Sequence, residues 1–368
     1  MNPPKERIAN RQLFYFLFMM RTTIVIATLP VLTAADALQD AWISSILSFF
    51  SAAFLVVMIG ALSIRFPELT VVQYSQKLLG TWGGRIFSLL FILNYLHIAS
   101  TDVRIYAEAI ITGFLPTTPL VFIISVMVVV AGLAAHAGVE VIGRAADLLF
   151  PFFGAMIALA LVLPLPEMRL LLGNLEPIMG RGLAPVLRGA LVPTLIIAQY
   201  LSLLMLTPTT TQPVKALKTA LCALAASSFV LTLVAGGVIV MLGPDRGSRS
   251  TFPFFAMVRT IQISDFVERV EILAVFSWGF GLFIGLSVFL LVATWGLSQV
   301  LGLSTYRPLI GPIMVICVAL AVHSYRDMFQ IWTFFSPPLV VPIQIFAIVV
   351  PMGILWLAYL YRRWLGRE

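Results

Sequence analysis

The side chains best able to do chemistry are charges that lie inside long apolar runs. Arg21 stands in the middle of Leu13–Leu32, a run of roughly 20 residues that is long enough to cross a bilayer. Thr22 and Thr23 follow it directly. Because an unpaired charge at mid-depth is costly, the segment is either a helix broken at a binding site or a helix whose Arg21 has a buried partner. We expect a tie to Asp102, with an anionic group of a ligand as the alternative.

Two further groups of charges lie in or beside apolar runs. The first is Asp102, Arg104 and Glu108. Arg104 and Glu108 are four residues apart, so on a helix they share one face and should pair as a structural clamp. The second group is Glu268, Arg269 and Glu271. We expect it to form an electrostatic collar that fixes the helix of Arg104, expected at 84–113, against the helix expected at 268–300.

Motifs for catalysis or cofactor binding are absent from the sequence. There is no nucleotide-binding glycine loop with Lys-Ser/Thr, no HExxH and no GxSxG. The two cysteines, Cys222 and Cys317, both lie in apolar runs and offer neither a disulfide framework nor a metal-ligand spacing. The sequence therefore predicts no catalytic residue, no metal and no cofactor, and the protein is not expected to be an enzyme.

The elements that must position these groups are membrane-spanning helices. With 60% hydrophobic and 11% charged residues, the chain predicts an all-α integral membrane protein. Its net charge of +7 is explained by basic loops and does not require a nucleic-acid partner. Apolar runs between charged or Pro/Gly breaks predict ten spans, at approximately 11–34, 39–63, 84–113, 118–136, 144–164, 189–207, 216–242, 268–300, 308–324 and 339–362.

The spans also predict an orientation and an internal symmetry. The short loops on one side carry only Arg326 among basic residues, so the positive-inside rule places both termini in the cytoplasm. Thr70–Leu79 and Ser250–Gln262 each resemble a short interfacial helix beside a Phe-Pro pair, on opposite sides of the membrane. This pattern predicts one membrane domain, 1–368, built of two inverted five-helix repeats, 11–165 and 189–363. Two unrelated interfacial helices are the alternative.

Under that symmetry, span six mirrors span one and should also be interrupted. It contains Pro193 and Thr194, followed by Gln199, Tyr200 and Ser202 at mid-depth. Irregular backbone is tolerated in a membrane only inside protein or against a cavity, where it binds substrate groups. Ordinary hydrogen bonding between helices is the other explanation for Gln199 and Ser202.

Several short motifs resemble one known family. They are Phe66-Pro67-Glu68-Leu69-Thr70 with Tyr74, Leu79-Gly80-x-Trp82-x-Gly84, Arg104 with Ala107-Glu108, Pro116-x-x-Pro119, Gly138-Val139-Glu140 with Arg144, Phe150-Pro151-Phe152, and Glu268-Arg269-x-Glu271 with Trp278. In these the chain resembles the spore germination permease-like family, the B subunits of germinant receptors, within the amino acid–polyamine–organocation superfamily. The resemblance implies a LeuT-like five-plus-five inverted repeat of ten helices with helices 1 and 6 broken.

The resemblance also implies a function and partners. It implies sensing of small germinants, typically amino acids, in the spore inner membrane, together with a germinant-receptor A subunit and a C-type lipoprotein. Family members often have glycines at the break of span one, where this chain has Thr23 and Val25. They often have Gly-x-Glu in span six, where Tyr200 and Ser202 align. The pocket is therefore expected to be smaller or filled, and the ligand to differ from a plain α-amino acid. Loss of ligand binding is the alternative.

The expected function is binding of an amino acid-like molecule at mid-membrane, between spans one and six and the midpoints of spans three and eight, to signal germination. The expected ligand-binding residues are Thr22, Thr23, Ile24, Ile98, Gln199, Tyr200, Ser202, Phe283, Ile284 and Gly285. An amino acid permease that works by alternating access is the alternative. A structural scaffold whose partner does the sensing is a third possibility.

Overall fold

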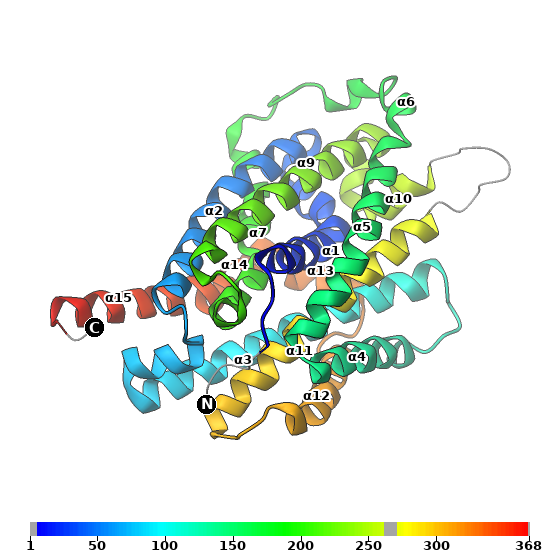
Figure 1. Ribbon diagram of the computed structural model, residues 1–368. Coiled ribbons are helices and arrows are strands. Elements are labelled where there is room, and N and C mark those ends of the chain that lie inside the picture. The colour runs from blue at the N-terminus through cyan, green and yellow to red at the C-terminus, as the bar shows by residue number, and fades with distance from the viewer. Residues whose placement is uncertain (1–5, 261–270, 367–368) are drawn as a thin grey trace.

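The protein is a bundle of helices gathered around one buried helix, α1 (Figure 1). The computed structural model describes residues 6–260 and 271–366, and this part of the chain contains no β-strand. The long helices are α1 Asn10–Ala37, α2 Ala41–Arg65, α3 Val71–Gly113, α4 Leu120–Ala137, α5 Val139–Val162, α7 Leu183–Leu195, α9 Ala216–Arg249, α11 Glu271–Leu301, α12 Ile310–His323 and α15 Val350–Trp364. The shorter helices include α6 Leu165–Met168, α8 Leu203–Leu206, α10 Pro253–Arg259, α13 Met328–Phe334 and α14 Pro337–Gln344.

The described helices agree with ten membrane spans. Eight segments are long and apolar enough to cross a bilayer, or nine if α12 and α13, which are bent by 97°, count as one span. One of the eight segments, Asn10–Arg65, contains both α1 and α2, which are separated by a turn at Leu38 with a φ of 49°. Nine segments with this one divided in two make ten, so the described helices are consistent with the predicted number of spans.

Helix α1 forms the centre of the bundle. Of its 28 residues, 21 are buried, and it packs most extensively against α9. Its N-terminal side is fixed to the segment that follows the sixth span, because the Ile8 amide donates to the Thr209 carbonyl at 2.9 Å and the Thr211 amide donates to the Ile8 carbonyl at 2.9 Å. The first and sixth spans are therefore held together at this end.

The first span is continuous, and the break expected near Arg21 is not there. Helix α1 keeps its helical hydrogen bonding through Arg21 and beyond. Thr23 and Val25 occupy the positions at which glycine would make a break easy, and neither favours a non-helical backbone as glycine does. The hydroxyls of Thr28 and Thr33 donate to carbonyls of the same helix, to Ile24 at 2.9 Å and to Leu29 at 2.8 Å, which anchors these side chains within α1.

The sixth span is interrupted, as predicted. Helix α7 ends at Leu195, the backbone leaves helical geometry at Ile196 (φ −75°, ψ 58°) and Ile197, and a 3-10 turn, Ala198–Ser202, leads into α8. These residues are buried, although the turn exposes backbone groups that a continuous helix would pair. The interruption therefore places free carbonyl groups in the middle of the bundle.

A helix forms in each of the two segments predicted to be interfacial, and their position at the membrane surface remains a prediction. Val71–Leu79 precedes the spanning part of α3 and is separated from it at Gly80, whose φ of 78° and ψ of 171° suit glycine. The second is α10, Pro253–Arg259, inside the predicted Ser250–Gln262. The boundaries of the two repeats, 11–165 and 189–363, remain a prediction.

Candidate functional site

Arg21 is bound at the interruption of the sixth span. The residue is 1% exposed, and its Nη1 donates to the Ile196 carbonyl at 3.2 Å. Its Nε has no hydrogen-bond partner among the described residues. The expected tie between Arg21 and Asp102 is not formed. The physical reason is the interruption itself, since Ile196 offers a freed carbonyl that accepts from the guanidinium without a second buried charge.

A small cavity lies on the other side of the interruption and is called the break cavity below. It is walled by Ile24 of α1, residues of α3, the turn of the sixth span, and the segments α13 and α14. Its volume is about 30 Å³. The cavity thus has room for about one water molecule. Three residues from the predicted ligand-binding set line it, namely Ile24, Ile98 and Gln199.

The polar part of the break cavity comes from three different elements. Asp102 of α3 is 8% exposed and makes no hydrogen bond or ion pair with any residue that the structure describes. Gln199 of the turn is 2% exposed and Gln344 of α14 is 9% exposed, and the Oε1 atom of each is buried without a partner. Buried polar groups in folded proteins are nearly always bonded, so this concentration of unpaired oxygens is the main chemical feature of the cavity.

The apolar part of the break cavity includes two aromatic residues at the end of a short helix. Phe334 of α13 and the following Phe335 line it together with His97, whose ring lies 5.3 Å from that of Phe334 in an edge-on arrangement. Phe335 is 8% exposed. Helix α13 is bent by 97° from α12, and this bend brings the two phenylalanines to the cavity.

The remaining predicted ligand-binding residues do not line this cavity. Thr23 faces α11, where a Cβ added at Gly281 would collide with its hydroxyl. Gly285 lies against Met20, and Ile284 is buried in the core. The residues that lie outside the break cavity are Thr22, Thr23, Tyr200, Ser202, Phe283, Ile284 and Gly285. The close approach of α11 to an unbroken α1, which the small residues of α11 permit, separates the two halves of the expected site.

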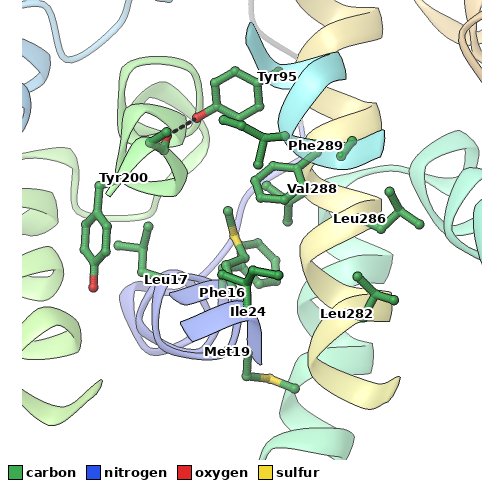
Figure 2. Close-up of a cluster of buried hydrophobic side chains, with 14 of the residues drawn as sticks. Phe16, Leu17, Met19, Ile24, Tyr95, Tyr200, Leu282, Leu286, Val288 and Phe289 are labelled. Carbon is green, nitrogen blue, oxygen red and sulfur yellow. Dashed lines mark hydrogen bonds between the residues drawn. The ribbon is translucent and has the colours of Figure 1, made fainter. Parts of the chain in front are cut away.

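Side chains fill the space between α1, α3, α11 and the turn of the sixth span (Figure 2). Phe16 and Ile24 of α1 pack with Phe289 of α11 in this cluster, which contains Tyr95 of α3. Tyr95 donates to the Ala198 carbonyl at 3.4 Å, so it satisfies a second carbonyl of the turn. The Ser202 hydroxyl donates to the Gln199 carbonyl at 2.6 Å and is used within the turn.

Arg104 and Glu108 form the predicted pair. The distances from Glu108 Oε1 are 2.9 Å to Arg104 Nε and 2.8 Å to Nη2. Arg104 also donates to the carbonyls of Ala321 and Val322, at 3.0 and 3.1 Å, and of Arg326, at 3.2 Å. The guanidinium thus satisfies carbonyls at the C-terminal end of α12, where unpaired acceptors and the helix dipole favour a cation. The pair is a structural clamp between α3 and α12.

The structure does not describe the side chains of the expected electrostatic collar. Glu268 and Arg269 lie outside the described residues, and Glu271 begins α11 with its side chain also outside them. The collar remains a prediction. Within the described ranges, no three His, Cys, Asp or Glu residues lie together in a way that could hold a metal ion.

Sequence reasoning missed Gln344, Phe334 and Phe335. A signal for Gln344 exists, since it is a polar residue within the apolar span predicted at 339–362. No comparable signal marks the two phenylalanines, because their place at the cavity depends on the bend between α12 and α13.

Comparisons with known proteins agree with this architecture. A family model described as "Spore germination protein" matches residues 7–350. The chain is 27% identical over 288 residues to spore germination protein KB of Bacillus subtilis (strain 168), which is 78% of this chain and 76% of that protein. It is 25% identical over 285 residues to spore germination protein YndE of the same organism, or 76% of this chain and 77% of that protein.

Solved structures support the same fold. MhsT in complex with L-phenylalanine has a TM-score of 0.65 at 14% identity, covering 95% of this chain and 89% of that chain. Mhp1 is a nucleobase-cation-symport-1 family transporter, solved in a closed conformation with bromovinylhydantoin bound. It has a TM-score of 0.62 at 13% identity, and the match covers 94% of this chain and 79% of that chain. The LeuT-like fold expected from the sequence is therefore confirmed.

Proposed function

The chain belongs to the spore germination protein family, and on this basis we propose that it is the membrane subunit of a germinant receptor. It binds a small molecule at mid-membrane, in the break cavity, and signals germination. The observation that carries this proposal is the interrupted sixth span, with Gln199 and Asp102 facing one cavity and holding no partner there. Polar groups that remain unpaired in the apolar interior are costly, and a ligand that bonds them compensates that cost.

Ligand binding requires the protein to open. A cavity of about 30 Å³ does not hold an amino acid, so the described conformation is the closed state. Outward movement of Phe334 and Phe335 enlarges the cavity on one side. Separation of α11 from α1 brings the second half of the expected site, including Thr23, Tyr200 and Gly285, to the ligand. A ligand that binds the open arrangement better shifts the population toward it, and partner subunits respond to that shift.

The proposed setting follows from the family. The protein lies in the spore inner membrane with both termini in the cytoplasm, and it acts with a germinant-receptor A subunit and a C-type lipoprotein. The apolar helices of the described chain support an integral membrane location. Catalysis is not part of the proposal, because the family relatives are germination proteins and the fold neighbours include transporters.

The proposal is tested by ligand-induced thermal stabilisation of the purified protein. Amino acids, sugars and nucleosides are screened with the wild type, with Gln199→Ala and with Gln212→Ala, an exposed control. A compound that stabilises the wild type and Gln212→Ala, with the effect lost in Gln199→Ala, supports the site. A screen without a hit, or a hit that Gln199→Ala retains in full, contradicts it.

A second candidate function is transport of an amino acid by alternating access. The likeness of the fold to MhsT, which was solved in complex with L-phenylalanine, favours this candidate. Uptake of a radiolabelled form of the stabilising compound into proteoliposomes separates the two functions. A receptor binds without net flux, whereas a permease accumulates label above protein-free liposomes.

A further inference from the structure

We infer that the break cavity is a site for one small monovalent cation, held by Asp102 together with the side-chain amides of Gln199 and Gln344. The cation is either the ammonium end of a small molecule or a free alkali ion. The first source rests on the proposed function, while the second does not.

The charge of the occupant follows from Asp102. This carboxyl group lies in the C-terminal half of the spanning part of α3, is 8% exposed and has no ion pair or hydrogen bond with the described residues. Arg104 and Arg21 do not neutralise it, because Arg104 is paired with Glu108 and Arg21 donates to the Ile196 carbonyl. A lone carboxylate is costly at that depth. The carboxyl group avoids that cost either by staying protonated or by binding one positive charge in the cavity, and our inference is the second.

The other titratable groups around Asp102 do not supply that charge in the described conformation. Cys317 of α12 and Tyr325, which follows α12, are the groups in electrostatic reach of Asp102, and neither is a cation in any protonation state. His97 lines the same cavity, where its ring packs against Phe334 and Tyr325. It makes no ion pair with Asp102.

The oxygen atoms that face the cavity further limit which cation can bind. Gln199 and Gln344 are nine-tenths or more buried, come from two different elements, and each has an unpaired Oε1. Carboxylate and amide oxygens bind hard cations and accept hydrogen bonds from ammonium groups. A single carboxylate balances a single charge, which favours a monovalent occupant over a divalent ion.

The size of the cavity sets the size of the bound part. A volume of about 30 Å³ matches one water-sized group. An ammonium head or a sodium ion fits this space, but a quaternary ammonium group with its methyl shell does not. Ile24 and Ile98 form the apolar wall beside it.

Thermal unfolding of the purified full-length protein in lipid nanodiscs tests the inference. Sodium chloride and methylammonium chloride are compared with tetramethylammonium chloride at equal ionic strength. We expect saturable stabilisation by sodium, by methylammonium or by both, and none by tetramethylammonium. Stabilisation by sodium alone identifies a free ion, and stabilisation by methylammonium alone identifies a ligand head group. The rise in unfolding temperature caused by the cation should disappear in Asp102→Asn. It should persist in Asp245→Asn, a control variant of an exposed acidic residue.

A second variant keeps the test decisive if Asp102→Asn does not fold. Gln344→Met retains the length of the side chain without its oxygen, and should raise the half-saturating cation concentration about tenfold or more. No difference between the three salts, or an unchanged response in these variants, overturns the inference. A cation response without any germinant hit instead counts against the proposed function and leaves the cation site in place.

Discussion

At the scale of single residues, Arg21 and Arg104 are both buried but have opposite energetic roles. Arg21 is held by one carbonyl, whereas Arg104 has a carboxylate and three carbonyls. Burying a cation in the protein interior costs several kcal/mol of desolvation, and one hydrogen bond returns only about 1.5–3 kcal/mol. Arg21 is therefore a poor contributor to stability, and Arg104 is a good one.

This contrast predicts that Arg21→Met does not lower the thermal unfolding temperature. The lost hydrogen bond to Ile196 is offset because a desolvated charge is removed. The response to the stabilising compound should change, since the turn of the sixth span is no longer held. A fall in the unfolding temperature as large as that of Arg104→Met would show that Arg21 is a structural residue instead.

Arg104→Met should destabilise the protein by about 3 kcal/mol or more, because it leaves Glu108 and the C-terminal carbonyls of α12 without their cation. The measurement is thermal or denaturant unfolding in the same membrane mimic. Arg144→Met is the matched control, since its i,i+4 pair with Glu140 is exposed and such pairs add little. Equal effects of the two substitutions would contradict the clamp.

At the scale of elements, the contact between α1 and α11 decides whether the expected site is open. Gly281 lets α11 approach until its backbone meets the Thr23 hydroxyl and the Phe153 ring. This contact and the continuous α1 together close the central space. The same contact must loosen if a ligand is to reach the residues around Gly285.

Gly281→Ala should therefore destabilise the closed conformation by about 1–3 kcal/mol through overpacking. The measurement is the thermal unfolding temperature. Gly154→Ala is the control, because no atom lies within 4 Å of its added methyl group. Thr23→Ala in the Gly281→Ala background should restore part of the loss. Absence of any rescue would mean that Phe153 alone, or another contact, carries the effect.

The spans, the two interfacial helices and the interruption of the sixth span could be predicted because their signals are local. Apolar runs set the spans, and the polar residues from Gln199 to Ser202 indicated the interruption. The continuous α1 was not predicted, since the family resemblance outweighed the missing glycines at Thr23 and Val25. Which side chains share a cavity depends on the rotation of each helix about its axis. Asp102 was thus recognised as a buried charge but not as a neighbour of Gln199 and Gln344.

At the scale of the whole molecule, the closed bundle suits a receptor that waits for its ligand. The first and sixth spans are fixed together at one end through Ile8 and the Thr209–Thr211 segment. Between their middle parts, Arg21 donates to the Ile196 carbonyl and apolar side chains pack around this contact. The proposed binding region lies beside this contact, next to the short helix α13.

The central claim is that a germinant occupies the break cavity, and germination of spores that carry Ile98→Phe tests it most directly. Ile98 lines the cavity, so the larger ring fills it, while Leu93→Phe on the same helix is 59% exposed and serves as control. We predict that Ile98→Phe raises the half-effective germinant concentration about tenfold or more, with Leu93→Phe unchanged. An unaltered dose response in Ile98→Phe spores, with normal protein levels, would contradict the claim.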